Sequence, residues 1–215
     1  MKKRLHKVLG IRPLTDSAFV LRLERQDLEF HPGQHLSIGP ANSNERREYS
    51  VYSPCQSPFL EVLIKEIPEG YVSPRLKQLK EGDEVFVRGP RGRFTVDEEE
   101  VNEAPLYFIA TGTGIAPFHC FVGSYPRLNY QLFHGIRYPE ERYEYTTYGN
   151  RYIACVSKGQ GGDFQGRVTD YLTDRPLDVN ALFFLCGNAN MIYDAFAILK
   201  KRGVNRERIF TEVYF

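Results

Sequence analysis

The sequence predicts an antiparallel β barrel of the Greek-key type, followed by a doubly wound parallel α/β domain. Three observations lead to this expectation. Short β-rich runs separated by turn residues fill the first half, a pattern typical of a small antiparallel barrel or sandwich. Continuous apolar runs alternate with helix-like segments in the second half, which is typical of strands buried on both faces. An acidic run, Asp97–Glu100, lies between the halves, so we expect domains at 1–98 and 99–215.

The strands expected in the first half are bounded by turn residues such as Pro32-Gly33 and Gly82-Asp83. They are Lys7–Leu9, Ala18–Leu23, His35–Gly39, Tyr49–Ser53, Phe59–Ile67 and Glu84–Gly89. One short helix is expected at Ser73–Lys80, with Ser73 as its N-cap.

The second half is expected to alternate strands with helices. The strands are Leu106–Ala110, Tyr130–Gly135, Tyr152–Val156, Leu182–Cys186 and Arg208–Tyr214. The helices lie near Pro117–Tyr125, Gly166–Thr173 and Ala189–Arg202. This order indicates a parallel sheet, at whose carboxyl edge ligands bind.

Composition excludes several function classes. In 215 residues, 28 Lys and Arg balance 27 Asp and Glu, which argues against a nucleic-acid-coating protein. The four cysteines show no C-x-x-C spacing, so we expect no local metal cluster and a reduced, intracellular chain. No apolar run reaches the roughly 20 residues that cross a bilayer. Since Lys7 and Arg12 also interrupt any export signal, we expect a cytoplasmic location.

The strongest local signal is the run Thr111-Gly112-Thr113-Gly114, which directly follows the strand LYFIA. Its glycines permit a sharp turn and a close approach to an anion, and Pro117 suits the first turn of a following helix. Backbone amides at such a strand exit can bind a pyrophosphate. The alternative is an ordinary tight turn without a ligand.

Two weaker signals lie in the first half. In Arg47-Glu48-Tyr49-Ser50, the arginine can bind a phosphate and Tyr49, on the same face of the strand, can stack on a flat ring. In Gly70-Tyr71-Val72-Ser73, a capping serine and neighbouring amides can add a second phosphate contact. Surface charge, core packing and an ordinary helix cap are the alternatives.

Two further signals lie near the end of the chain. Cys186-Gly187-Asn188 again follows a buried strand, although a buried free cysteine is commonly a small hydrophobe. Tyr214 and Phe215 form an aromatic terminus, which suits either a core anchor or a lid on a flat cofactor.

Taken together, these motifs resemble the ferredoxin–NADP reductase family, which joins an FAD-binding barrel to an NADP-binding α/β domain. The resemblance extends over nearly the whole chain. Its motifs are HPGQ (31–34), REYS (47–50), GYVS (70–73), GDEVFVRGPRGRF (82–94), GTGIAP (112–117), HGIR (134–137), CGN with Met191, and EVY (212–214).

The resemblance implies a site for FAD in the first domain. Arg47 and Ser73 would hold the pyrophosphate, in the segment that begins at Gly70, while Tyr49 would stack on the flavin. Ser50 would lie near the flavin N5 as a catalytic residue, and the strand Val62–Ile64 would contribute backbone contacts. Tyr214 would cover the other flavin face, although the extra residue Phe215 leaves open which of the two stacks.

The resemblance also implies a nicotinamide-nucleotide site. The loop Thr111–Gly114 would hold the pyrophosphate, with Gly187 nearby. Cys186 would set the angle of the nicotinamide ring, and Glu212 would be the carboxylate near the reacting centre. NADP(H) is favoured over NAD(H) by four residues that can bind a 2′-phosphate, namely Arg137, Ser157, Lys158 and Arg167. Solvated loop cations are the alternative.

The implied function is hydride transfer between NADPH and FAD, with single electrons passed to or from a separate carrier such as ferredoxin or flavodoxin. Basic residues that could dock an acidic carrier are Arg75, Lys77, Lys80, Arg88, Arg91 and Arg93. One alternative is an NADH-dependent reductase component of an oxygenase, although the chain has no cysteine spacing for a fused iron–sulfur domain. Another is a non-catalytic flavin- or nucleotide-binding subunit.

Overall fold

The computed structural model describes residues 4–96 and 104–214. The chain divides into two compact units. The first unit comprises Met1–Thr95 and Ala116–Ser124, and the second unit comprises Val96–Ile115 and Tyr125–Phe215. The expected domain boundary, between 98 and 99, lies outside the described residues.

The first unit is a six-stranded antiparallel sheet with the strand order β4-β3-β6-β1-β2-β5. Its strands are β1 (Arg4–Pro13), β2 (Ala18–Glu24), β3 (His35–Pro40), β4 (Arg47–Ser50), β5 (Phe59–Lys65) and β6 (Glu84–Arg91). A bridge between Val51, just after β4, and Val62 in β5 joins the two edges of this sheet. The predicted antiparallel barrel is therefore confirmed.

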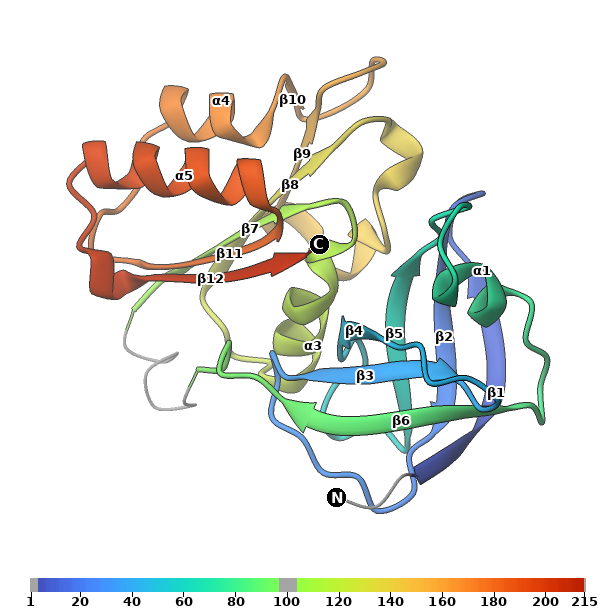
Figure 1. Cartoon of the computed structure of the whole chain (residues 1–215). Coiled ribbons are helices and arrows are strands. Elements are labelled where there is room, and N and C mark those ends of the chain that lie inside the picture. The colour runs from blue at the N-terminus through green and yellow to red at the C-terminus, as the bar shows by residue number, and fades with distance from the viewer. Residues whose placement is uncertain (1–3, 97–103, 215) are drawn as a thin grey trace. The chain divides into compact units, whose positions relative to one another are not determined.

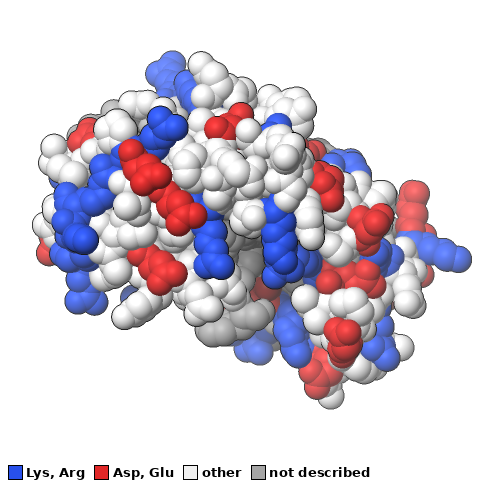
Figure 2. Space-filling view, turned by 90° about the horizontal axis from the view of Figure 1, so that it is seen from above, with Lys and Arg blue, Asp and Glu red and all other residues white. Residues whose placement is uncertain are grey.

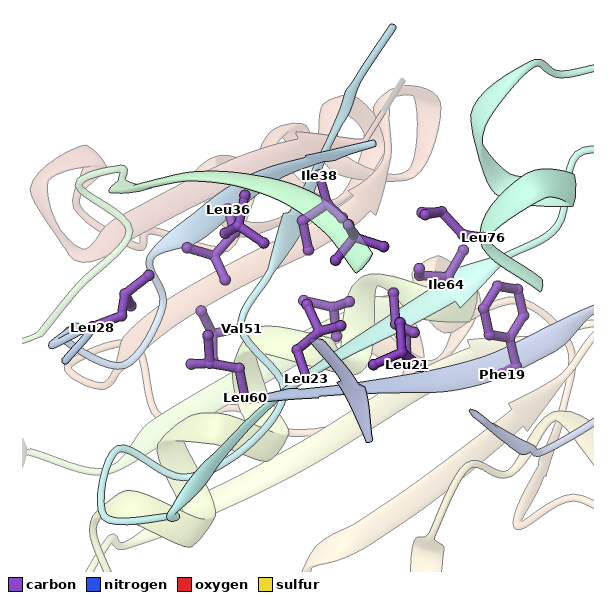
Figure 3. Close-up of a cluster of buried hydrophobic side chains, with 14 of the residues drawn as sticks. Phe19, Leu21, Leu23, Leu28, Leu36, Ile38, Val51, Leu60, Ile64 and Leu76 are labelled. Carbon is purple, nitrogen blue, oxygen red and sulfur yellow. The ribbon is translucent and has the colours of Figure 1, made fainter. Parts of the chain in front are cut away.

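Apolar side chains from opposite walls of the barrel form its core. Figure 3 shows Leu21 from β2, Ile38 from β3 and Ile64 from β5 pointing toward one another, with Leu76 of helix α1 (Val72–Lys77) beside them. Because side chains alternate between the two faces of a strand, one face of each strand supplies this core.

Helix α3 (Ala116–Ser124) also packs within the first unit, although it follows a strand of the second. The ring of His119 stacks on Tyr52 with a centroid separation of 4.0 Å. The Ser124 hydroxyl accepts a hydrogen bond from the Cys55 amide at 2.9 Å, and Cys120 joins the barrel core. The helix therefore contributes to the barrel despite its place in the sequence.

The second unit is a six-stranded parallel sheet with the order β10-β9-β8-β7-β11-β12. Its strands are β7 (Leu106–Thr111), β8 (Tyr130–Ile136), β9 (Tyr152–Val156), β10 (Phe164–Gln165), β11 (Leu182–Asn188) and β12 (Ile209–Tyr214). The predicted parallel α/β domain is confirmed. Strand β10 and several short 3-10 turns, η2 (Pro139–Glu141), η3 (Tyr145–Thr147), η4 (Gly149–Arg151) and η5 (Arg206–Arg208), were not predicted.

Helices α4 (Val168–Asp174) and α5 (Ala189–Lys201) lie together over one face of this sheet (Figure 1). Leu172 of α4 and Leu199 of α5 pack against Phe133, Phe183 and other residues of that face. On the opposite face the rings of Phe108, Tyr130 and Phe184 pack together. Both faces of β7, β8 and β11 are therefore removed from water, which explains their continuous apolar character. No helix within residues 4–96 and 104–214 is long and apolar enough to cross a membrane.

Candidate functional site

The strand order of the second unit reverses between β7 and β11. From β7 the chain moves outward through β8, β9 and β10, and then returns to the other side of β7 with β11 and β12. Ligands of open α/β sheets bind at the carboxyl ends of the strands beside such a switch point. The 3-10 turn η1 (Gly112–Ile115) follows β7 there, and Gly187 lies at the corresponding end of β11.

Glycines let these two strand ends approach each other closely. A Cβ added to Gly114 would lie 2.4 Å from the Cys186 carbonyl oxygen, and one added to Gly187 would lie 2.4 Å from Thr111 Oγ1. Gly112 has a φ of +52°, with open space where its Cβ would be. Gly114 and Gly187 are thus required by contacts within the protein itself, whereas Gly112 is required by its backbone conformation.

Polar contacts fix the same two strand ends. Thr111 Oγ1 accepts a hydrogen bond from the Asn188 amide at 3.0 Å. The Asn188 side chain in turn caps α5 by accepting from the Asn190 amide at 3.0 Å. The loop Thr111–Gly114 is therefore tied to the start of α5, and its conformation is set by β11 as well as by β7.

Cys186 and Glu212 are paired across β11 and β12. The Cys186 side chain is fully buried, with its Sγ 4.0 Å from Glu212 Oε2, and the side chain of Tyr214 also hydrogen-bonds it. Burial, and after it the charge of Glu212, raises the pKa of this thiol well above its usual range. The structure thus brings together three predicted site residues, Cys186, Glu212 and Tyr214, and the thiol of Cys186 is neutral. The fourth, Phe215, lies outside the described residues.

His134 in β8 is a residue of this site that the sequence patterns did not single out by its chemistry. Its side chain is fully buried, with Nε2 2.8 Å from the Gly112 carbonyl oxygen and Nδ1 2.8 Å from the Tyr152 hydroxyl. Burial lowers the pKa of His134 to about 4, so the ring is neutral at neutral pH. It appears in the sequence only as the first residue of the HGIR motif, which gives no indication of either contact.

Three of the predicted 2′-phosphate residues lie where β8 and β9 end. The backbone pairing of the two strands continues past their ends, since the Lys158 amide donates to the Arg137 carbonyl at 2.8 Å. The Ser157 hydroxyl donates to the Ile136 carbonyl at 3.1 Å. All three side chains are exposed. Arg167, also exposed, immediately precedes α4 and is separated by Gly166 from the short strand β10, which pairs with β9.

In the first unit, Arg47 and Tyr49 lie two residues apart on β4, as expected. The guanidinium of Arg47 is largely exposed, with Nη1 donating to the Arg46 carbonyl at 2.7 Å and lying 3.7 Å from a carboxylate oxygen of Glu45. Tyr49 is half-buried against the barrel core, and this burial raises the pKa of its phenol to about 12. Strand β4 therefore carries an accessible cation beside a neutral aromatic ring.

The other predicted residues of β4 and β5 are buried. Ser50 ends β4 and is nearly inaccessible, and the side chains of Val62 and Ile64 belong to the barrel core. Any ligand contact from Val62 and Ile64 is therefore limited to their backbone groups.

The prediction that Ser73 caps a helix is wrong. Helix α1 begins one residue earlier, at Val72, and its N-cap position is Tyr71, without a side-chain capping bond. Ser73 is buried, and its Oγ accepts the Ile67 amide at 2.9 Å. Gly70 closes the same turn, with its amide bonded to the Ile67 carbonyl at 2.8 Å. A pattern of residue types cannot reveal this bond, because it connects Ser73 to a turn six residues earlier.

The basic residues considered for carrier docking differ in their contacts. Lys77 forms an ion pair with Glu66, and Arg75 lies over the Tyr71 ring at 3.7 Å, so both have partners close in sequence. Exposed basic residues at the end of β6 and just beyond it are Arg88, Arg91 and Arg93. On the face seen in Figure 2, positive and negative side chains are interspersed.

Comparison with known proteins gives consistent results at the level of sequence. A model of the oxidoreductase FAD-binding domain matches residues 14–96. The flavodoxin/ferredoxin–NADP reductase of Escherichia coli (strain K12) is 30% identical, over 87% of this chain and 86% of that protein. The reductase component of propane 2-monooxygenase from Rhodococcus jostii is 28% identical over 97% of this chain, which spans only 62% of that relative's length.

Solved structures share the fold. A ferredoxin NADP+ reductase from Neisseria gonorrhoeae, with bound FAD and NADP, superposes with a TM-score of 0.86 at 22% identity, covering 100% of both chains. The flavohem-like FAD/NAD-binding domain of nitric oxide dioxygenase from Vibrio cholerae has a TM-score of 0.87 at 22% identity, covering 100% of this chain and 99% of that one. This chain and the two solved structures share the same fold, an antiparallel barrel and a parallel α/β sheet in one chain.

Proposed function

The chain belongs to the ferredoxin–NADP reductase family, and from this premise we propose that it transfers hydride between NADPH and FAD and exchanges single electrons with a separate carrier such as ferredoxin or flavodoxin. The observation that carries the proposal is the switch-point loop, in which Thr111–Gly114 packs against Gly187 beside Cys186 and Glu212. FAD, when bound, supplies the ability to accept a hydride and release electrons one at a time.

The residues of the first unit fit an FAD site. Arg47 offers an exposed guanidinium suited to a pyrophosphate, and Tyr49 offers a neutral ring suited to stacking on the flavin. The Ser73 hydroxyl already accepts from Ile67 but retains a proton that can be donated to a phosphate oxygen. We assign backbone contacts to Gly70 and the Val62–Ile64 segment, and a position near the flavin N5 to Ser50.

The residues of the second unit fit a nicotinamide nucleotide. Backbone amides of Gly112–Gly114 would hold its pyrophosphate, with Thr111 and Gly187 maintaining the loop. Since Cys186 is a buried neutral thiol, its role would be to position the ring rather than to attack it. Glu212 would supply the carboxylate near the reacting atoms, and Tyr214 or Phe215 would cover the flavin face until nicotinamide displaces it.

An anaerobic titration of the purified flavoprotein with NADPH tests the central claim. Stoichiometric bleaching of the flavin absorbance is expected, because hydride transfer to FAD removes its visible bands. Bound flavin that NADPH fails to bleach would exclude hydride transfer. A preparation without flavin that also fails to take up added FAD would favour the non-catalytic alternative.

A preference for NADPH is the finer part of the proposal. Arg137 and Lys158 are joined through their backbones at the ends of β8 and β9, so both cations can reach one phosphate, with Ser157 and Arg167 near the same strands. For Arg137→Ala/Lys158→Ala we expect KM for NADPH to rise at least about tenfold and KM for NADH to stay unchanged. Lys200→Ala, which removes an exposed cation of α5, is the matched control. Equal KM values for the two nucleotides in the unmodified protein would contradict the preference.

A second candidate is an NADH-dependent reductase component of an oxygenase. It is favoured by the similarity to the propane 2-monooxygenase reductase component, which extends over 97% of this chain. Efficient turnover with NADH and poor turnover with NADPH would select this reading. In either case we propose that Arg88, Arg91 and Arg93 attract an acidic carrier, which predicts slower electron transfer at high ionic strength.

A cytoplasmic location is also part of the proposal. It is supported by the four cysteines, each of which is a free thiol in the structure, as expected for a reducing compartment. Cell fractionation with detection of the native chain tests this assignment.

A further inference from the structure

We propose that His134 is a positioning residue, whose hydrogen bond to the Gly112 carbonyl fixes the orientation of the loop that binds the nicotinamide nucleotide. The inference rests on the proposed function, because it assigns a role to that loop. His134 lies in the middle of β8, paired with Ala110 of β7 and Ala154 of β9. From this central strand its ring reaches both the loop after β7 and the side chain of Tyr152.

The two contacts of His134 determine which nitrogen carries the proton. A carbonyl oxygen only accepts, so Nε2, 2.8 Å from Gly112 O, must be the protonated nitrogen. Nδ1 then carries the lone pair, and it accepts a hydrogen bond from the Tyr152 hydroxyl 2.8 Å away. Both nitrogens of a neutral ring are thus satisfied, as a fully buried histidine requires. The lowered pKa of this group agrees with a neutral ring.

The bond at Gly112 has a direct consequence for the next amide. In a planar trans peptide, the carbonyl of one residue and the N–H of the next point in opposite directions. The one cis bond among residues 4–96 and 104–214 is Gly89–Pro90, so the Gly112–Thr113 peptide is trans. Holding the Gly112 carbonyl against His134 therefore directs the Thr113 N–H away from the ring.

This hydrogen bond matters because Gly112 has no side chain that could hold its own backbone conformation. With a φ of +52° and no neighbour within 4 Å of its missing Cβ, the residue has no side-chain contact that holds its conformation. Tyr152, in contrast, is buried and stacks on Tyr148 with a centroid separation of 5.7 Å, so its hydroxyl is held in place. His134 thus connects Gly112, which has no side chain of its own, to a buried aromatic cluster.

Three variants of the full flavoprotein test the role. His134→Leu removes both bonds, and we expect its Kd for NADP+, measured by calorimetry, to rise about tenfold. His134→Gln keeps an amide N–H near the position of Nε2, and its Kd should lie within about threefold of the original value. Leu132→Ala is the control, because Leu132 is equally buried on the same strand and its side chain has no polar atom. Its Kd should stay unchanged despite a loss of stability.

Flavin content and the visible spectrum should be the same in all three variants, since Arg47 and Tyr49 belong to the first unit. The role is excluded if folded His134→Leu binds NADP+ with the original Kd. It is also excluded if Leu132→Ala weakens binding as much, or if His134→Gln is no better than His134→Leu.

A spectroscopic test of the His134 tautomer uses the original protein. It depends neither on nucleotide binding nor on whether His134→Leu folds. Long-range ¹H–¹⁵N correlation of the original protein without nucleotide should show His134 protonated at Nε2 only, and Tyr152→Phe should change its Nδ1 shift. A ring protonated at Nδ1 overturns the inference. If the original protein shows the expected tautomer but binds neither NADP+ nor NAD+, the proposed function fails while the bond to Gly112 stands.

Discussion

Burial keeps three side chains of the two candidate sites neutral at neutral pH. It raises the pKa of Tyr49 to about 12, raises that of Cys186 well above its usual range and lowers that of His134 to about 4. These groups can stack, position a ring or hold a loop, but none is poised to exchange protons near pH 7. Charged interactions with ligands are therefore left to exposed arginine and lysine side chains and to the partly buried Glu212.

The depressed pKa of His134 predicts a loss of stability in acid. Its value is 6.5 in the unfolded chain and about 4 in the folded one, so the unfolded state binds more protons as the pH falls through this window. Stability is complete above pH 6.5, and about 2 kcal/mol should be lost between pH 7 and pH 4.5. The groups that face the ring are the carboxylate of Glu141 and the phenols of Tyr143 and Tyr152.

Urea denaturation of the original protein and of His134→Gln across this range measures the effect. Because glutamine does not titrate, the variant should lack this contribution and show a correspondingly shallower pH dependence. Parallel curves for the two proteins would show that His134 does not carry it.

The close approach of the chain at Gly114 gives a second prediction at the residue scale. Gly114→Ala places a Cβ 2.4 Å from the Cys186 carbonyl oxygen, so the ends of β7 and β11 must separate. We expect a loss of about 2 kcal/mol in the free energy of unfolding. Thr113→Ala, which adds no atom to the same loop, should stay within about 0.5 kcal/mol. If chemical denaturation gives equal losses of unfolding free energy for Gly114→Ala and Thr113→Ala, the close approach of the two strand ends does not determine the effect.

At the scale of elements, β-rich runs between turn residues and long apolar runs identified the strands. Strand β2 was predicted almost to the residue because it is a short run of mostly buried β-forming residues, and β11 because both of its faces are buried. The 3-10 turns between β8 and β9 have no such pattern. The polar bonds of His134 and Ser73 also escaped prediction, because each joins residues whose proximity depends on the folded sheet or turn.

The position of Ser73 within α1 can be distinguished from a cap by mutation. An N-cap accepts aspartate or asparagine well, whereas the Ser73 hydroxyl is buried and accepts the Ile67 amide. Ser73→Ala should cost about 1 kcal/mol through the unpaired amide, and Ser73→Asp should cost more because it buries a charge. Urea denaturation of both variants measures their loss in the free energy of unfolding. A smaller loss for Ser73→Asp than for Ser73→Ala would support Ser73 as the N-cap.

At the scale of the whole molecule, the sequence predicted both architectures and their order. It could not show which unit α3 would join, because only the four residues of η1 separate the helix from β7 and an apolar helix face does not identify the sheet that it covers. The chain in fact leaves the first unit near residue 95, forms β7, and returns for the nine residues Ala116–Ser124. The first unit therefore needs a segment that begins 25 residues beyond the end of its last strand, β6.

This return of the chain predicts which unit a mutation in α3 will loosen. Phe121 is fully buried, its ring lies 6.5 Å from that of Phe94, and its edge meets the backbone at Gly33. Phe121→Ala should cost about 3 to 5 kcal/mol, as a large core truncation does. Hydrogen exchange should then accelerate first in the barrel strands β3 and β5, whereas β7 and β8, which flank α3 in the sequence, keep their protection. Phe183→Ala, a truncation in the core of the second unit, is the control and should give the reverse pattern. If Phe121→Ala exposes β7 and β8 before the barrel, α3 belongs energetically to the sheet it follows in the sequence.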